Sequence, residues 1–293
     1  LLTKRENPFK ELALGDDKDE NLERSLALSY DALKPDLRQR FKQVGVLPLD
    51  ATFDRDLLAA LWGDADPDDS RTPLRVLVDE NLLEAADESG RAYRQHRLLR
   101  AYARALLSAE EDETAFGRYA DHVTAQAEQF RTLPPQDWGQ LDPLLPHVDA
   151  VGEALAAHWA AAGESPSDAL VTRGAAFAYN ITNYVFRRPL MVTTAHGREL
   201  RGLRWLEMGL AFSTRRGEQR RASLFANQLG LAWNGLGEKR KALAYYEQGL
   251  AAYRALGDQR GEATSLNNIG GVWSDLGEKR KALDFYEQAL PLQ

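Results

Sequence analysis

One stretch of this chain returns forty residues later, and this repetition constrains the fold more than any other feature. The run GEKRKALAYYEQGL begins at Gly237, and GEKRKALDFYEQAL begins at Gly277. The same spacing relates Ala222–Gly230 to Glu262–Gly270. A fixed period of this length is typical of stacked supersecondary units that share one continuous core. The sequence therefore predicts a solenoid, an architecture that offers extended surfaces for binding rather than for catalysis.

Each unit is predicted to be a helical hairpin. Apolar and small residues recur at helical spacing from Leu266 to Trp273 and again from Ala282 to Leu290. Gly277 lies between these two stretches, and glycine readily adopts the positive φ with which many helices end. Two helices joined by a short turn follow from this pattern.

These hairpins resemble the tetratricopeptide repeat. The family pattern of Leu-Gly, aromatic, Ala, aromatic and Ala is matched by Ile269-Gly270, Trp273, Ala282, Tyr286 and Ala289. The period exceeds the usual length of about 34 residues, which implies a variant with an extended second helix. Because the pattern is still running at Gln293, we expect further repeats to follow in the natural protein.

The N-terminal third has a different pattern, which predicts helices followed by a β-hairpin. A glycine-containing turn at 88–91 favours the hairpin, and proline suits the first position of a helix. The expected helices are Asn21–Leu33, one that starts at Pro35, Asp54–Trp62, Thr72–Asp79 and Leu98–Leu107, with strands at Leu82–Ala86 and Ala92–Gln95. This order is typical of a winged-helix domain.

Three motifs in this region are similar to the winged-helix domain of NB-ARC signalling NTPases, which belong to the STAND class. They are Ser25–Leu33, Val46–Asp50 with Phe53–Trp62, and Gln95–Ala103. A winged helix followed by tetratricopeptide repeats recurs in bacterial members of that class. The resemblance implies that the chain is the C-terminal, regulatory and sensing part of such a protein.

The expected fold is therefore mainly α, with a winged-helix domain followed by an α-solenoid. Four segments are predicted: a remnant of a preceding helical subdomain at 1–19, the winged helix at 20–109, irregular helical hairpins at 110–196 and the repeats at 197–293. The third segment is expected to be wholly helical, with helices at Glu113–Arg131, Pro143–Ala162 and Ala169–Arg187.

His96 is the residue that the family resemblance singles out. In NB-ARC proteins a histidine at this place contacts the β-phosphate of ADP and holds the NTPase in its resting state. A histidine at a helix N-terminus suits an anion. The sequence alone favours an interfacial histidine without a ligand, whereas the family resemblance favours the nucleotide contact in the intact protein. The chain contains no G-x-x-x-x-G-K-[ST] phosphate loop, so we expect no enzymatic activity from it. ADP or ATP with Mg²⁺ is expected only in the full-length protein.

The repeat pattern also indicates a surface for a protein or peptide ligand, namely the concave face formed by the first helix of each unit. Side-chain amides there can hydrogen-bond a peptide backbone. The residues expected on this face are Asn227, Gln228, Thr264, Asn267, Asn268, Ser274 and Asp275. For Asn227 and Asn267 a second interpretation stays open, in which they bond neighbouring helices instead.

Basic residues recur at the start of each second helix. Stacking would align them into an edge stripe for an acidic partner. The stripe consists of Lys239, Arg240, Lys241, Lys279, Arg280 and Lys281. The alternative is a solvated helix start at which Glu238 and Glu278 offset the unfavourable helix dipole.

Composition excludes several classes of function. The net charge of −7 disfavours nucleic-acid binding, and the absence of cysteine excludes disulfides and thiolate metal sites. No apolar run is long enough to span a membrane and no signal peptide is recognisable, which fits a cytoplasmic protein. The remaining histidines lack metal-ligand spacing, and the acidic stretch 64–69 is interpreted as a solvated loop.

Three functions remain open on this basis. The first is a STAND signal transducer, whose repeats sense a ligand while the winged helix holds an intramolecular nucleotide-binding domain in its ADP state. Such a protein would form homo-oligomers only on activation. The second is a DNA-binding winged-helix regulator with a repeat sensor, and the third is a constitutive tetratricopeptide scaffold. The acidic residues around 68–80 disfavour the second.

Overall fold

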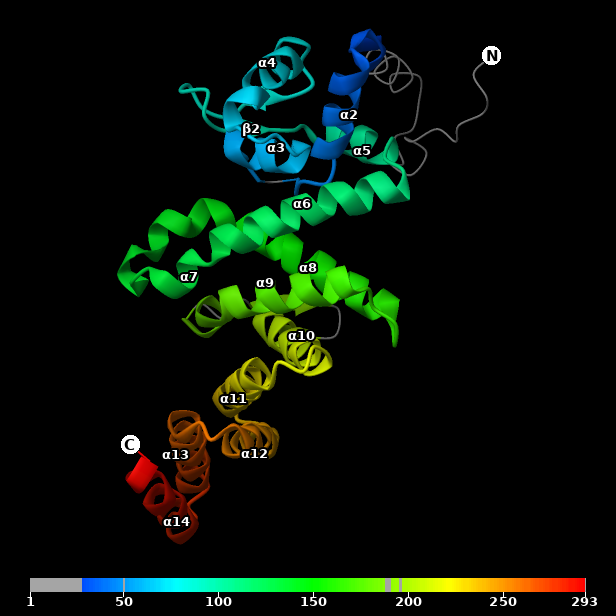
Figure 1. Ribbon diagram of the computed structural model, residues 1–293. Helices are drawn as coiled ribbons and strands as arrows, with labels where there is room; N and C mark the ends of the chain where they lie inside the picture. The colour runs from blue at the N-terminus through cyan, green and yellow to red at the C-terminus, as the bar shows by residue number, and fades with distance from the viewer. Residues whose placement is uncertain (1–27, 50, 188–190, 195–196, 293) are drawn as a thin grey trace. The chain divides into compact units, whose positions relative to one another are not determined.

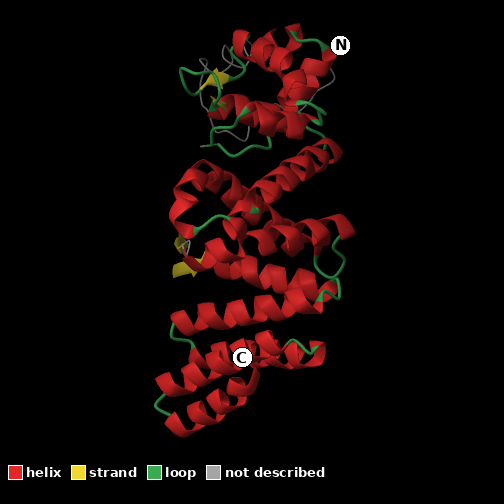
Figure 2. Cartoon of the chain, turned by 60° about the vertical axis from the view of Figure 1, so that its left-hand side comes forward, coloured by secondary structure: helices red, strands yellow, loops and turns green. Residues whose placement is uncertain are grey.

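The computed structural model describes residues 28–49, 51–187, 191–194 and 197–292. It divides the chain into two compact units, one of Leu1–Gln126 with Gly139–Val151 and one of Ala127–Trp138 with Gly152–Gln293. The fold is mainly helical, as predicted, and the strands of the described residues form two small hairpins (Figure 2). Among the helices that the structure describes, none combines the length and the hydropathy needed to cross a lipid bilayer.

The first unit contains the helices and the hairpin predicted for a winged helix (Figure 1). Residues 28–32 are helical, while 21–27 of the predicted first helix lie outside the described residues. The following elements are α2 (Pro35–Val44), α3 (Arg55–Trp62), the 3-10 helix η2 (Pro67–Ser70), α4 (Arg71–Asp79), β1 (Glu84–Ala85), β2 (Tyr93–Arg94), α5 (Arg97–Ala105) and α6 (Ala109–Ala127).

Strands β1 and β2 are antiparallel, with Glu84 opposite Arg94 and Ala85 opposite Tyr93. Tyr93 also pairs with Phe53 just before α3, so the hairpin is attached to the helices by backbone hydrogen bonds. Pro35 begins α2, as expected, and Asp54 caps α3 by accepting a bond from the backbone N–H of Leu57 at 2.8 Å.

The core of this unit lies between α2, α3, α4 and α5. Phe41, Leu58 and Leu77 are fully buried, and the rings of Tyr30, Phe41 and Tyr102 lie 5.7 to 6.2 Å apart. Gly45 ends α2 against the backbone of α5. A Cβ at Gly45 would lie 2.6 Å from the backbone nitrogen of Arg104, so only glycine permits this approach.

The acidic stretch 64–69 is not wholly solvated, which corrects the sequence-based interpretation. The carboxylate of Asp64 is only 10% exposed and accepts two bonds from the guanidinium of Arg40, at 2.6 and 2.8 Å. Ser70 donates a further bond to it at 2.5 Å. These bonds lower the pKa of Asp64, because they stabilise its charged form. Asp64 therefore ties the loop to α2.

The second unit is built from successive helices that pack in pairs. Its elements, with those that link it to the first unit, are α7 (Gln129–Thr132), η3 (Pro135–Leu144), α8 (Leu145–Ala162), α9 (Asp168–Arg187), β3 (Met191–Thr194), β4 (Gly197–Leu200), α10 (Arg201–Arg215), α11 (Gln219–Gly235), α12 (Lys239–Leu256), α13 (Gln259–Asp275), α14 (Lys279–Ala289) and η4 (Leu290–Leu292). Each helix from α9 to α14 packs against the next, which confirms the predicted solenoid (Figure 1).

The antiparallel hairpin β3–β4 corrects the expectation that residues 110–196 are wholly helical. Met191 pairs with Leu200 and Thr194 with Gly197. Val192, Thr193 and Thr194 are β-branched residues, which favour extended backbone. The predicted segment boundaries at 19/20, 109/110 and 196/197 stay predictions.

The Leu-Gly and tyrosine positions of the repeat explain how its two helices approach. Gly230 of α11 faces the ring of Tyr246 of α12, and a Cβ there would lie 2.5 Å from the ring. Tyr246 is 1% exposed, and the next hairpin repeats the arrangement with Gly270 and Tyr286. The missing side chain thus makes room for an aromatic ring, which explains why these positions recur together.

Candidate functional site

The first candidate site is the surface of α11 and α13, the first helices of the two regular hairpins. Because both helices belong to the same repeat, residues forty apart occupy equivalent places. Gln228 and Asn268 are equivalent in this sense, and both are half-buried. Neither side chain forms a hydrogen bond within the described part of the chain, so both amides remain available to a ligand.

Asn227 is buried between the helices and is not part of this accessible surface. It is 5% exposed, and its amide nitrogen donates a bond to the hydroxyl of Ser265 at 2.9 Å. The Ser265 hydroxyl lies 3.0 Å from the carbonyl of Gly261 one turn earlier, and can donate to it. Asn227 therefore joins α11 to α13 inside the solenoid, which favours the interpretation that it bonds a neighbouring helix.

The other residues expected on this face differ in their availability. Asn267 is half-buried and Ser274 is exposed, and neither has a side-chain partner among the described residues. Thr264 is exposed, but its hydroxyl donates to the carbonyl of Arg260 in its own helix at 2.8 Å. Asp275 accepts from the ammonium of Lys239 at 2.6 Å. Gln228, Asn267, Asn268 and Ser274 are thus the available polar groups of the predicted face.

The residues of the predicted basic stripe are engaged to different degrees. Lys239 bonds both Asp275 and Asn234. The ammonium of Lys241 lies 4.0 Å from the centre of the Trp233 ring, and Lys281 lies 4.4 Å from Trp273. These cation–π contacts join the two helices of each hairpin.

Lys279, Arg280 and Arg240 are exposed, and their side chains have no partner among the described residues. The charge available to a partner is therefore concentrated on these three side chains. In both hairpins the tryptophan precedes the lysine of the cation–π contact by eight residues. This spacing could have indicated the contacts from the sequence.

His96 caps helix α5. Its ring nitrogen Nδ1 accepts a weak bond, 3.4 Å long, from the backbone N–H of Leu98, and the residue is exposed. The preceding Gln95 is 7% exposed, and neither atom of its amide has a hydrogen-bond partner within the described residues. The role of His96 in sensing a nucleotide stays a prediction.

A second histidine, His147, forms a buried network that the sequence did not indicate. Its Nδ1 lies 3.0 Å from the Tyr119 hydroxyl and its Nε2 lies 3.0 Å from the carbonyl of Thr52. Since that carbonyl can only accept, Nε2 carries the proton and the hydroxyl donates to Nδ1. Burial lowers the pKa of His147, and likewise that of His122.

This network connects the segment before α3 to helices α6 and α8, which is a structural role. Over the ranges that the structure describes, no three His, Asp or Glu side chains are arranged to hold a metal ion.

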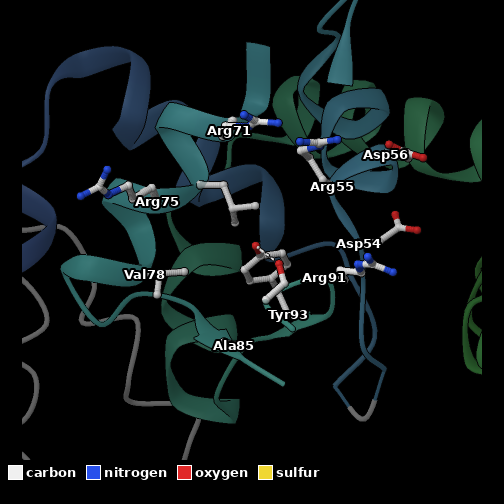
Figure 3. A pocket seen from close by; sticks show the side chains of 11 residues that line it. Asp54, Arg55, Asp56, Arg71, Arg75, Val78, Ala85, Arg91 and Tyr93 are labelled. Atoms are coloured by element: carbon white, nitrogen blue, oxygen red, sulfur yellow. Dashed lines mark hydrogen bonds between the residues drawn. The ribbon is translucent and has the colours of Figure 1, made fainter. Parts of the chain in front are cut away.

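A hollow of about 690 Å³ lies between α3, α4 and the β1–β2 hairpin, and Figure 3 shows the side chains that line it. Its lining consists of Asp54, Arg55, Asp56, Arg71, Leu74, Arg75, Val78, Ala85, Gly90, Arg91 and Tyr93. Four of these residues are arginines, and they come from three different elements. The sequence places Arg71 and Arg75 one helical turn apart, but it does not indicate that Arg55 and Arg91 lie around the same hollow.

Comparison with known proteins supports the repeats directly. The tetratricopeptide repeat family matches residues 218–293, which contain α11 to α14. No curated protein gives a significant match to the chain. Among solved structures, the chain is similar to a signal transduction ATPase with numerous domains (STAND) with a tetratricopeptide repeat sensor from Pyrococcus horikoshii. The identity is 13% and the TM-score 0.35, over 96% of this chain and 54% of that protein. The chain thus spans about half the length of that protein.

Proposed function

We propose that this chain is the sensor and regulatory part of a STAND-class signalling protein, and that its tetratricopeptide repeats bind an extended segment of a protein ligand. The observation that carries the binding proposal is the pair of equivalent, half-buried amides of Gln228 and Asn268. Both lack intramolecular partners among the described residues. Two amides at the same place in successive repeats suit a peptide backbone, which offers donors and acceptors at regular intervals.

The regulatory half of the proposal is supported by the sequence motifs of the winged helix and by the position of His96. A histidine that is exposed at the start of a helix can contact a phosphate of a nucleotide held by a neighbouring domain. In this proposal the chain itself performs no catalytic step. It changes the equilibrium between a resting and an active arrangement of the full-length protein, which requires the ligand to bind the active arrangement more tightly.

The binding proposal is tested by selecting peptides from a displayed random library against the chain and measuring their affinity for variants. We expect Gln228→Ala and Asn268→Ala each to weaken a selected peptide about fivefold to tenfold, the value of a hydrogen bond lost from a neutral amide. Gln248→Ala is the matched control, because Gln248 is an exposed amide on α12 without a partner among the described residues. Selected peptides that bind all four proteins equally would exclude the proposed face.

The regulatory proposal is tested in the full-length protein. Replacing His96 by alanine should speed the release of bound ADP, measured by exchange of a fluorescent analogue. If the release rate stays the same, His96 does not contact the nucleotide.

A further inference from the structure

The hollow between α3, α4 and the β1–β2 hairpin combines an apolar floor with a charged rim. Leu74 and Val78 of α4, Ala85 of β1 and the ring of Tyr93 of β2 form the floor. Leu74 is 3% exposed and also belongs to the core, so the floor is held firmly in place. A volume of about 690 Å³ is large enough for an aliphatic side chain together with neighbouring backbone.

The rim carries four arginines, and the four aspartates that line it or pair with them are unevenly distributed among these arginines. One oxygen of Asp68 accepts a hydrogen bond from Arg71 at 3.2 Å and forms an ion pair with Arg55 at 3.0 Å, so two guanidinium groups share one carboxylate. Figure 3 shows the side chains of Arg55 and Arg71 on the same side of the hollow. The Nε of Arg55 is buried and has no hydrogen-bond partner within the described residues.

The hairpin supplies a further charge. The guanidinium of Arg91 forms no hydrogen bond or ion pair within the described residues, although Arg91 lines the hollow. Arg75 is only loosely paired, since its Nε lies 3.6 Å from Asp79, and its side chain is 83% exposed. The rim thus offers guanidinium groups from α3, α4 and the hairpin around an apolar centre.

We propose that this hollow is a docking site for an acidic peptide segment of a partner protein, one in which carboxylates flank an aliphatic side chain. The aliphatic side chain would cover the floor, and the carboxylates would meet the guanidinium groups of Arg55, Arg71 and Arg91 around it. Guanidinium groups bind carboxylates through two parallel hydrogen bonds, which adds specificity to charge attraction.

Nucleic acid fits the same surface less well. Asp54 and Asp56 also line the hollow, and Asp68 and Asp79 lie beside its arginines. A regular row of phosphates would meet these carboxylates, whereas a peptide can place its charges only opposite the arginines. The apolar floor also has no counterpart in a phosphate backbone.

The proposal is tested by fluorescence polarisation with the whole chain and a labelled peptide, Glu-Glu-Asp-Leu-Glu-Asp-Glu. We expect saturable binding that weakens as salt is raised, because exposed ion pairs are screened. Combining Arg71→Gln with Arg91→Gln should weaken it about tenfold. Arg91→Gln alone should weaken it about threefold. This single variant removes no side-chain hydrogen bond or ion pair among the described residues, so its effect does not come from loss of folding.

The control variant is Arg97→Gln, which removes an exposed arginine of the same unit outside the hollow and should leave the affinity unchanged. A second peptide with serine in place of leucine should bind at least fivefold more weakly, because it cannot cover the floor. The proposal is overturned if the arginine variants bind as tightly as the parent, or if both peptides bind alike. It is also overturned if random duplex DNA binds more tightly than the peptide and loses affinity in the same variants.

Discussion

Replacing Gly230 by alanine tests the packing that builds each hairpin. Alanine is favoured over glycine in a helix interior by about 1 kcal/mol, so the substitution would stabilise an unconstrained helix. At Gly230, however, the new methyl group would lie 2.5 Å from the ring of Tyr246, which is 1% exposed and has no room to move aside. Overpacking of this kind costs about 1 to 3 kcal/mol.

Because the contact is close and the ring is enclosed, we expect the upper part of that range. The net effect of Gly230→Ala is then a loss of about 1 to 2 kcal/mol in the free energy of unfolding. Gly271 in α13 is the matched control. Among the described residues, the nearest atom to a Cβ there is the Tyr286 hydroxyl oxygen, at 3.9 Å. Gly271→Ala should therefore stabilise the chain by up to about 1 kcal/mol.

Urea denaturation followed by far-UV circular dichroism measures both effects. The two variants differ from the parent by the same methyl group in the same kind of helix, so opposite signs can only come from the tertiary contact. Repeat proteins unfold in parts, and the transition should therefore be fitted with terms for individual repeats and for the interfaces between them. A Gly230→Ala chain as stable as the Gly271→Ala chain would refute the packing argument.

Two further predictions concern buried polar groups. Asp64→Asn should cost about 2 to 4 kcal/mol in urea denaturation, because Arg40 would lose its buried carboxylate, whereas the exposed Asp69→Asn should change stability by less than about 0.5 kcal/mol. The pKa of Asp64 is lowered in the folded chain, so its contribution to the free energy of unfolding is present above the unfolded pKa of 3.8. This contribution is lost as pH falls through the folded pKa. If acid destabilises the parent and Asp64→Asn equally, Asp64 makes no such contribution. The pKa of His147 is also lowered in the folded chain, so its contribution to the free energy of unfolding is complete above pH 6.5. This contribution is lost as pH falls through the folded pKa of His147. In His147→Gln the slope of stability against pH below 6.5 should be smaller, and an unchanged slope would show that another group, such as His122, is responsible.

The candidate binding face was only partly predictable. Gln228 and Asn268 follow from the phase of the repeat, because a helix position that faces outward in one unit does so in the next. The burial of Asn227 does not follow, since it depends on Ser265 of another helix. Position on a helix can be read from spacing, but whether a neighbouring helix covers that position depends on how the units stack.

The same limit applies to charge. The stretch 64–69 has the composition of a solvated loop, yet Asp64 is enclosed because Arg40 on α2 and Ser70 reach it. Likewise, no motif or spacing in the sequence relates Arg55, Arg71 and Arg91, which are far apart along the chain. Only the packing of α3, α4 and the hairpin brings them around one hollow.

Local and periodic properties were thus determined by the sequence alone. The forty-residue period, the Leu-Gly positions and the proline and aspartate at helix starts determined the hairpins and most helix boundaries. These features act over a few residues or repeat at regular intervals. Only the tertiary structure decided which polar side chains bond each other and which remain available to a partner. Those outcomes depend on contacts between residues distant in sequence, and no spacing within a helix records such contacts.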